Sequence, residues 1–302
     1  MTQPIQPFPH LPILQEVSQQ QYPGSTLYVV ATPIGNTGDI TLRAINVLAI
    51  ADAVACEDTR NTAHLLSRYG LSKELMAVHE HNEREAADKV IARLQAGQRI
   101  ALVSDAGTPA VSDPGARIVD AVRKAGLRVM PLPGASAGIA ALSAAGLLND
   151  RFYFAGFLPS KAAQRQTALD ALRTTTATIV MYEAPHRIVD TIDALARSFE
   201  PTRRIVFARE LTKLFEEIHR CTLSEAAAWL AQDPHREKGE YVLLLEGATA
   251  DTDAGDADAE RILRILLTEC SVKQAASLAS QITGRKKNAL YDLALRLKDA
   301  DQ

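Results

Sequence analysis

The stretch IALVSDAGTPAVSDPG, residues 100–115, decides the fold, because an apolar run leads directly into a loop of small and turn-forming residues. Such a run is typical of a strand covered on both faces, as in α/β proteins with parallel sheets. Asp113 is a candidate cap for a helix that begins at Pro114, but capping leaves residues 104–109 unexplained. We therefore predict a ligand loop here, at the carboxyl end of the strand, where open α/β sheets bind ligands.

Outward from this loop, short apolar runs alternate with helical stretches, which predicts βαβ units and a parallel sheet. After a break at residues 146–151, more closely and less regularly spaced strands predict a second, mixed sheet. The predicted strands are Thr26–Ala31, Ala53–Glu57, Met76–His79, Arg99–Ser104 and Arg128–Leu132 in the first lobe, and Phe152–Phe157, Thr178–Tyr182, Arg204–Ala208, Glu217–Cys221 and Tyr241–Leu245 in the second.

The two ends of the chain differ in composition from these lobes. Residues 1–24, rich in proline and glutamine, predict a flexible leader, and the α/β lobes are expected over 25–147 and 148–247. Residues 248–260 carry five acids and no bulky apolar side chain, which favours an acidic linker. The remaining residues, 261–302, predict short amphipathic helices that form a basic tail.

Composition excludes several classes of protein. The net charge of −3 is not that of a general polyanion binder, so a nucleic-acid site must be a local basic patch. The three cysteines lie far apart and match no metal-ligand spacing, which indicates a reducing compartment and no metal site. No apolar run approaches the roughly 18 residues of a membrane span, and the N-terminus is unlike a signal peptide. We therefore expect a cytoplasmic protein.

Two further loops of small residues follow predicted strands. ATPIGNTGDIT (31–41) and PLPGASAGIAALSAAG (131–146) allow close approach of a ligand to the backbone and to a helix N-terminus. Ordinary turns capped by Thr41 and Ser136 are the alternative interpretation. The first stretch does not match the G-x-G-x-x-G or P-loop pattern, so dinucleotide and triphosphate sites are disfavoured there.

Charged side chains also gather at strand ends. ACEDTR places Glu57, Asp58 and Arg60 after the second strand, and HEHNE adds His81 near the end of the next. A cluster of this kind suggests a functional role, although Asp58 as a helix cap is the simpler alternative.

Basic side chains cluster in the second lobe and in the tail. Each alone is compatible with a solvated surface or an ion pair, but three clusters at the strand ends of one lobe favour a phosphate-binding rim. Lys161 and Arg165 are spaced to share one helix face. The basic candidates for RNA contact are Arg60, Lys161, Arg165, His186, Arg187, Arg209, Lys286 and Lys287.

These stretches occur together in a known family. In order along the chain they read ATPIGNTGDITLRA, ACEDTR, VSDAGTPAVSDPG, PGASA, GFLPSK, YEAPHR and KGEYVLLLEG. From about residue 25 to 300 the chain resembles the ribosomal RNA small-subunit methyltransferase I family of the tetrapyrrole methylase superfamily. SDAGTPxxSDPG and EDTR set this branch apart from the cobalamin and sirohaem methylases, which carry a G-D-P loop instead.

The resemblance implies two α/β lobes of the tetrapyrrole methylase type, with S-adenosylmethionine in the cleft between them, plus a small helical C-terminal appendage. It also implies a homodimer that methylates the ribose 2′-hydroxyl of a cytidine in the decoding region of 16S rRNA, without a metal. Carried over by motif, the expected cofactor contacts are Pro33, Ile34, Asp105, Ala106, Gly107, Thr108, Val111, Ser136, Ala137, Tyr182, Glu183 and Leu211.

Methylation of a hydroxyl requires that the oxygen be aligned with the methyl donor and lose its proton. Glu57, Asp58 and His81 are the candidate catalytic residues. Asp58 or Glu57 is favoured as the base or as the group that orients the ribose.

Two other functions are open to a chain of this kind. A methylase of a tetrapyrrole or another small molecule is disfavoured by the basic rim and the basic tail. A non-catalytic RNA-binding or ribosome assembly factor is disfavoured by the three loops of small residues, for which a scaffold has no need.

Overall fold

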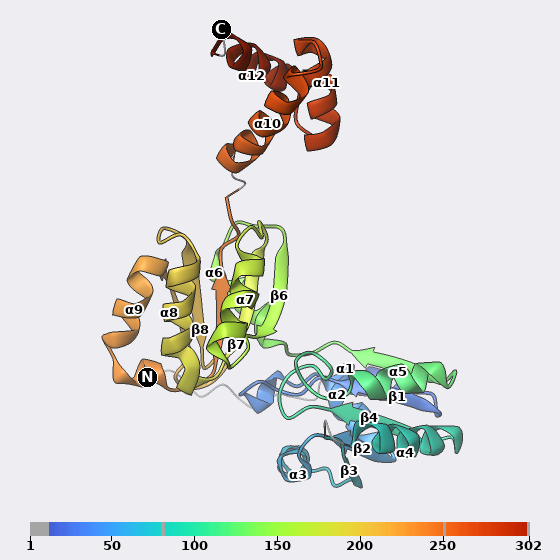
Figure 1. Ribbon diagram of the computed structural model, residues 1–302. Helices are drawn as coiled ribbons and strands as arrows, with labels where there is room; N and C mark the ends of the chain where they lie inside the picture. Colours follow the sequence, from blue (N-terminus) through green and yellow to red (C-terminus); the bar gives the residue numbers. More distant parts are fainter. Residues whose placement is uncertain (1–11, 80–81, 250–251, 301–302) are drawn as a thin grey trace. The chain divides into compact units, whose positions relative to one another are not determined.

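The computed structural model describes residues 12–79, 82–249 and 252–300. The chain divides between Gly247 and Ala248 into two compact units (Figure 1). Within the described residues, the first unit holds two five-stranded sheets covered by helices, and the second is helical. This confirms the predicted fold class of two α/β lobes with a helical C-terminal appendage.

The first lobe alternates strands and helices, as the sequence predicts. Its elements are β1 (Thr26–Val30), η1 (Thr37–Asp39), α2 (Leu42–Ile50), β2 (Ala53–Cys56), α3 (Thr59–Arg68), β3 (Leu75–Ala77), α4 (Glu83–Gln95), β4 (Arg99–Val103), α5 (Ala116–Lys124) and β5 (Arg128–Leu132). The sheet is parallel throughout, in the order β3-β2-β4-β1-β5. On β4, Ala101 and Val103 enter one core, and Ile100 and Leu102 enter the core on the opposite face. Two covered faces explain the unbroken apolar run of this strand.

The second lobe has the predicted mixed sheet. Its elements are α6 (Ala137–Ala145), β6 (Phe152–Phe157), α7 (Ala162–Leu172), β7 (Thr178–Glu183), η2 (Pro185–Arg187), α8 (Ile188–Ser198), β8 (Arg204–Arg209), β9 (Glu217–Thr222), α9 (Leu223–Ala231), η3 (Pro234–Glu237) and β10 (Tyr241–Leu245). The strand order is β6-β7-β10-β8-β9. The pair of β6 and β7 is parallel and the other pairs are antiparallel.

Helix α6 packs on the second sheet. Its Ala141 and Ala145 share a core with Val206 and Leu244, while α7, α8 and α9 cover the opposite face. Alanine side chains are short enough to let the helix lie close to the strands, so this Ala-rich helix packs on that face. The lobe boundary predicted at residue 147 is therefore wrong, because the chain enters the second lobe before α6.

The predicted leader is partly ordered. Helix α1 (Ile13–Gln19) buries Val17, and Tyr22 belongs to a core of the first lobe. The Tyr22 hydroxyl donates a 2.9 Å hydrogen bond to the Val17 carbonyl, and Arg99 Nε donates to the Tyr22 carbonyl at 2.9 Å. The prediction of a flexible leader is therefore wrong for residues 12–24, and residues 1–11 lie outside the described residues.

The second unit consists of α10 (Thr252–Leu267), α11 (Val272–Thr283) and α12 (Lys287–Ala300). Its buried residues, Leu263, Ala276 and Leu290 among them, form a core of their own. Helix α10 begins inside the segment 248–260, for which the sequence predicts a linker, so that prediction is wrong from Thr252 onward. Alanine-rich sequence favours a helix, and acidic residues stabilise a helix near its N-terminus. These two effects outweigh the lack of bulky apolar residues, on which the prediction of a linker was based.

The described residues lack two features that would bear on function. None of their helices is long and apolar enough to cross a membrane. They also contain no group of three or more His, Cys, Asp or Glu side chains arranged to hold a metal ion.

Candidate functional site

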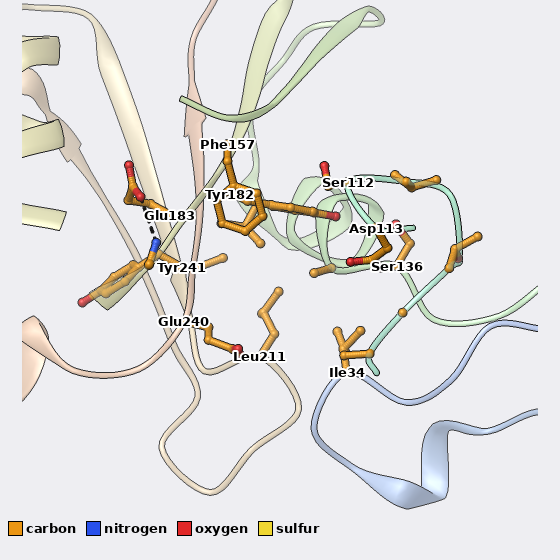
Figure 2. Close-up of a pocket in the computed structure, with 18 of the residues that line it drawn as sticks. Ile34, Ser112, Asp113, Ser136, Phe157, Tyr182, Glu183, Leu211, Glu240 and Tyr241 are labelled. Carbon is orange, nitrogen blue, oxygen red and sulfur yellow. Dashed lines mark hydrogen bonds between the residues drawn. The ribbon is translucent and has the colours of Figure 1, made fainter. Parts of the chain in front are cut away.

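A cavity of about 280 Å³ lies between loops of the two lobes of the first unit (Figure 2). Its lining is mainly apolar, with a few polar and charged groups, which is typical of a small-molecule site. The lining residues are Ile34, Ala106, Gly107, Thr108, Val111, Ser112, Asp113, Ser136, Ala137, Phe157, Tyr182, Glu183, Ala184, Pro185, Ala208, Leu211, Lys213, Glu240, Tyr241 and Val242.

The loop after β4 is fixed to its two neighbouring loops. Thr32 and Gly107 form an antiparallel bridge with backbone hydrogen bonds of 2.9 and 3.0 Å. The Thr108 hydroxyl donates to the Ala135 carbonyl at 3.0 Å. Gly107 has a φ of +80°, which a residue with a Cβ rarely adopts. Glycine is therefore the residue that the backbone favours at the point where these loops meet.

The third loop of small residues also makes a close approach. A Cβ on Gly134 would lie 2.6 Å from the Ala31 Cβ, so a larger residue would separate the loops after β5 and β1. Ser136 occupies the N-cap position of α6, but its side chain makes no capping hydrogen bond. Instead the Gly138 amide donates to the Tyr182 hydroxyl at 3.1 Å. The first turn of α6 is thereby held against the second-lobe wall of the cavity.

Backbone strain concentrates in the two loops on either side of the cavity. Five non-glycine residues in the described chain have positive φ, and only Ser25 lies elsewhere. Ala110 and Ser112 belong to the loop after β4, and Glu210 and Thr212 to the loop after β8. Strain of this kind is retained where the surrounding structure fixes the backbone, most often at functional sites.

A polar contact joins these two lobes beside the cavity. The Asn36 amide, in the loop after β1, donates to the Thr212 hydroxyl at 3.1 Å. Next to it, Lys213 Nζ lies 2.9 Å from Glu210 Oε1 and 2.8 Å from Glu240 Oε2. The loop after β8 is thus tied to both the first lobe and the start of β10.

The structure places most of the expected cofactor contacts at the cavity. All of them except Pro33 and Asp105 line it. Asp105 points to α3 instead, where its carboxylate accepts hydrogen bonds from the Asp58 amide at 3.2 Å and from Asn61 Nδ2 at 2.7 Å.

The expected catalytic residues lie away from the cavity lining. Asp58 caps α3, since its carboxylate accepts hydrogen bonds from the Arg60 and Asn61 amides at 2.7 and 3.4 Å. Glu57 is half-buried, and this burial, together with the negative charges of Asp105 and Asp113, raises its pKa. His81 lies outside the described residues.

Asp113 is absent from the site residues expected from the sequence, where it is interpreted as a helix cap. Helix α5 begins only at Ala116, and its N-cap position is Gly115, whose amide donates to Glu83 Oε1 at 2.8 Å. Glu83 on α4, and not Asp113, accepts the hydrogen bond from the N-terminus of this helix. Asp113 lines the cavity instead. Lys213 and the segment 240–242 were also missed, although the latter belongs to the quoted stretch KGEYVLLLEG.

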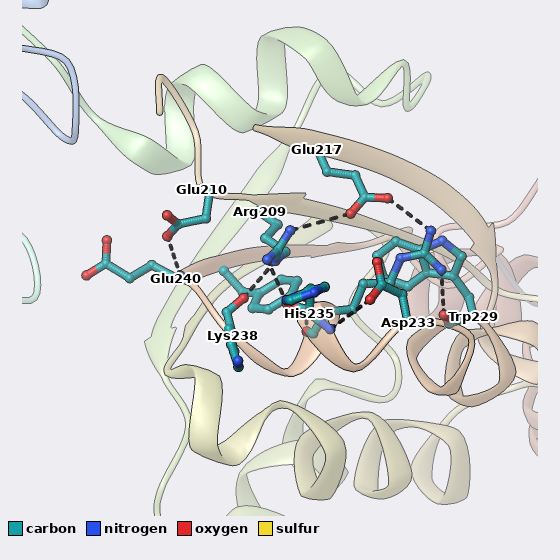
Figure 3. A network of polar contacts seen from close by, with 10 residues as sticks. Arg209, Glu210, Glu217, Trp229, Asp233, His235, Lys238 and Glu240 are labelled. Atoms are coloured by element: carbon teal, nitrogen blue, oxygen red, sulfur yellow. Dashed lines mark hydrogen bonds and ion pairs between the residues drawn. The ribbon is translucent and has the colours of Figure 1, made fainter. Parts of the chain in front are cut away.

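The structure separates the basic candidates into exposed and internal side chains. Arg209 is 8% exposed and donates hydrogen bonds to the Lys238 and His235 carbonyls at 2.7 and 2.6 Å (Figure 3). Arg165 is 7% exposed, so it does not share an exposed face of α7 with Lys161. Arg187 pairs with Glu183 at 3.1 Å. The exposed candidates are Arg60, Lys161, His186, Lys286 and Lys287.

The prediction of a phosphate-binding rim is therefore wrong for two of its basic residues, because their side chains are buried. Arg209 sits at the end of β8 with its guanidinium turned toward η3, and Figure 3 shows it between Glu217 and the η3 backbone. Its hydrogen-bonding capacity is used by carbonyl groups of the protein. Arg165 and Arg209 are interior residues, and their side chains are not available to a phosphate on the surface.

Comparison with known proteins finds relatives over most of the chain. Residues 26–227 match the family model for Tetrapyrrole (Corrin/Porphyrin) Methylases, and residues 253–298 match that for the RsmI C-terminal HTH domain. Ribosomal RNA small subunit methyltransferase I of Escherichia coli O157:H7 is 49% identical over 89% of this chain and 94% of its own length. The protein of the same name from Neisseria meningitidis serogroup A is 50% identical over 91% of this chain and 95% of its own.

A solved structure extends the likeness to the fold. Uroporphyrin-III C-methyltransferase from Thermus thermophilus, complexed with S-adenosyl homocysteine, is 19% identical and has a TM-score of 0.51. The match covers 73% of this chain and 97% of that one. At this level of identity the likeness concerns the two-lobed fold alone.

Proposed function

Because this chain belongs to the ribosomal RNA small subunit methyltransferase I family, we propose that it methylates small-subunit ribosomal RNA with S-adenosylmethionine as donor. The finer proposal is transfer to the ribose 2′-hydroxyl of a cytidine in the decoding region of 16S rRNA. The observation that carries the proposal is identity close to one half over nearly the full length of chain and relative. The proposed substrate locates the activity in the bacterial cytoplasm.

The cavity suits this cofactor by its chemistry. Ile34, Val111 and Leu211 provide apolar surface for an adenine ring, and the first turn of α6 offers backbone polar groups. Even apart from Asp113, acidic side chains outnumber basic ones in the lining, with Glu183 and Glu240 against Lys213. A net negative lining favours a ligand that carries a sulfonium and an ammonium group.

When bound, S-adenosylmethionine supplies a methyl group that is already activated by its positive sulfur. The protein must hold the ribose oxygen in line with that methyl group, and good alignment lowers a barrier by up to roughly 7–11 kcal/mol. The bridge between Thr32 and Gly107 and the contact between Gly138 and Tyr182 fix the walls that set this alignment. The expected bases Glu57, Asp58 and His81 stay predictions.

We propose that RNA contacts exposed basic residues in each of the two units. Lys161 and His186 are exposed in the second lobe, and Lys286 and Lys287 are exposed in the tail. Phosphate contacts are electrostatic, so exposed cations of this kind would supply much of the affinity. The tail matches a helix-turn-helix domain model, which supports a role in binding nucleic acid.

We also propose the homodimer that the resemblance implies. Exposed apolar side chains gather on and beside β6, an edge strand of the second sheet, where Leu148 is 94% exposed and Phe152 and Tyr153 about half exposed. An unpaired edge strand with exposed aromatic residues is suited to burial against a second copy. Light scattering should give the mass of a dimer, and Phe152→Asp should shift it toward the monomer. A monomeric wild-type protein would contradict this proposal.

The proposed reaction is tested in cells that lack the protein. Mass spectrometry of their 16S rRNA should show the loss of one ribose methylation in the decoding region, which the wild-type gene restores. Unchanged ribose methylation would overturn the proposed substrate.

A further inference from the structure

Among the described residues, one carboxylate of the cavity lining has no cationic partner. Glu183 is engaged on both oxygens, by the Ala184 amide at 2.9 Å and the Thr191 hydroxyl at 2.6 Å, and it also pairs with Arg187. Glu240 pairs with Lys213 at 2.8 Å. Asp113 makes no ion pair with any described residue. Figure 2 shows it with Ser136 on one side of the cavity, facing Tyr182.

The backbone on both sides of Asp113 is fixed. Ala110 and Ser112 hold left-handed conformations before it, with φ of 67° and 63°. After it, Gly115 has a φ of +124°, and its amide is bound by the buried Glu83. A Cβ on Gly115 would also lie 3.0 Å from Leu102 Cδ2. A preorganised loop therefore holds the side chain of Asp113 at the cavity. A group that acts on a substrate needs such a fixed position.

The charged groups around Asp113 are mostly acidic. Burial raises the pKa of its carboxyl, a hydrogen bond with the Ser104 hydroxyl lowers it, and the negative charge of Asp105 raises it again. Glu57, which follows β2, is close enough to Asp113 and to His79 for its charge to interact with theirs. Glu183, Glu240 and Lys213 face the cavity from the second lobe. The outcome is a pKa above that of an ordinary aspartate, which makes the ionised form a stronger base.

We propose that Asp113 is the general base that takes the proton of the ribose 2′-hydroxyl, an inference that rests on the proposed function. As the 2′-oxygen forms its bond to the methyl carbon, the bond from that carbon to sulfur breaks and its electron pair stays on sulfur. The positive sulfur thereby becomes a neutral thioether. The hydroxyl proton passes to the Asp113 carboxylate and from there to water.

Asp113 fits this task better than the bases expected from the sequence. Asp58 uses its carboxylate to cap α3, and Asp105 braces the same helix. Glu57 is close enough to Asp113 for their charges to interact, but it does not line the cavity. A base must come within hydrogen-bond reach of the proton that it removes, so a group in the lining has priority.

The test replaces the carboxylate by an amide of the same shape. Asp113→Asn should lower kcat for small-subunit RNA by about 10²–10⁴-fold, the usual contribution of a general base. Calorimetry should give affinities for S-adenosylhomocysteine and for RNA within about twofold of the wild-type values, because a base acts in the transition state. Asp120→Asn, which removes an exposed acid on α5 that pairs with Lys124, is the control for charge and should leave kcat unchanged.

The pH dependence of the rate separates catalysis from structure. In the wild-type enzyme, kcat should fall as the pH falls through the raised pKa of Asp113, because the protonated acid accepts no proton. Ser104→Ala removes the hydrogen bond that lowers this pKa, so the acid limb should move to higher pH. In Asp113→Asn the residual rate should lose that limb.

Each other outcome would overturn the proposal. If wild-type protein methylates RNA and Asp113→Asn keeps its rate, Asp113 is not the base, while the proposed function stands. If Glu57→Gln loses the rate and the acid limb while Asp113→Asn keeps both, Glu57 is the base. If Asp113→Asn loses affinity for S-adenosylhomocysteine in proportion to the rate, its side chain binds the cofactor. Failure of the wild-type protein to methylate RNA would instead reject the proposed function.

Discussion

Thr32 and Gly107 exchange backbone hydrogen bonds of 2.9 and 3.0 Å and thereby join the loop after β1 to the loop after β4. Ile34 follows the first partner closely, and Ala106 to Thr108 surround the second, so this bridge sets one wall of the cavity. The contact depends on a left-handed backbone at Gly107, which glycine adopts without the steric cost of a Cβ.

Gly107→Ala should therefore weaken S-adenosylhomocysteine binding by tenfold or more. A Cβ would meet Ile34 Cγ2 and the Ala135 carbonyl only at ordinary contact distances, so the cause is backbone strain of roughly 1–2 kcal/mol. The strain is relieved most readily by shifting the loop that lines the cavity. Calorimetry measures the loss of affinity.

Gly126→Ala is the matched control, because Gly126 has a similar φ of +72° and no atom lies within 4 Å of the point that its Cβ would occupy. It should cost similar stability and leave the affinity unchanged. Equal affinities in the two variants would contradict the assignment of this cavity to the cofactor.

Lys161→Glu and Arg165→Glu should separate RNA binding from stability. Lys161 is exposed, so its reversal should weaken RNA binding and lower the salt slope by about one. Arg165 is buried, so its reversal should place a carboxylate inside the second lobe and lower the free energy of unfolding by more than about 2 kcal/mol. Thermal unfolding and RNA titrations at several salt concentrations measure both effects. A fully stable Arg165→Glu protein would contradict its placement in the interior.

Removal of residues 248–302 should leave a folded core with unchanged affinity for S-adenosylhomocysteine. The tail has its own apolar core, and the cavity is lined entirely by residues before Gly247. RNA association should weaken, because Lys286 and Lys287 are lost with the tail. Aggregation of the shortened protein would show that the tail is structural, and RNA binding at full strength would show that it is dispensable.

Acid should weaken the second lobe through Glu246. The hydrogen bond from Arg204 lowers the pKa of Glu246 below its usual value of 4.5, although burial opposes the shift. A carboxyl with a lowered folded pKa stabilises the fold above its unfolded pKa, and this contribution is lost as the pH falls through the folded pKa. Glu246→Gln should thus cost about 1 kcal/mol at pH 7, a value limited by solvent exposure of the pair, and the difference should vanish in strong acid.

Denaturant unfolding at several pH values measures this difference. Glu85→Gln is the control, because Glu85 forms an exposed ion pair with Lys89 on α4 and should have no measurable effect. A constant difference between wild type and Glu246→Gln from pH 7 into strong acid would contradict the explanation.

The sequence predicted the elements that local pattern determines. Strand β4 is apolar at every position after Arg99 because both faces of the sheet are covered. Such an apolar run can be recognised from the sequence alone. The loops of small residues were likewise visible, since a left-handed position such as Gly107 is encoded by the residue itself.

Features that depend on contacts distant in sequence were not predictable. The local sequence predicts that Asp113 is a helix cap. In the structure Glu83, on another helix, accepts the hydrogen bond from the Gly115 amide. The sequence around Arg165 and Arg209 predicts surface charges. Nothing in it indicates that Arg165 is buried, or that Arg209 donates a hydrogen bond to a carbonyl group of η3. The alanines of α6 likewise give no sign of which sheet they cover.

We propose that this chain methylates a ribose of small-subunit ribosomal RNA with a methyl donor held in the cavity. The most direct test incubates the purified protein with small ribosomal subunits from cells that lack it and with S-adenosylmethionine labelled in its methyl group, followed by mass spectrometry of the RNA. The label should appear on the ribose of one cytidine in the decoding region with the wild-type protein, and at a strongly reduced level with Gly107→Ala. Label on a base, at scattered positions, or at the same level with both proteins would contradict the proposed reaction and donor site.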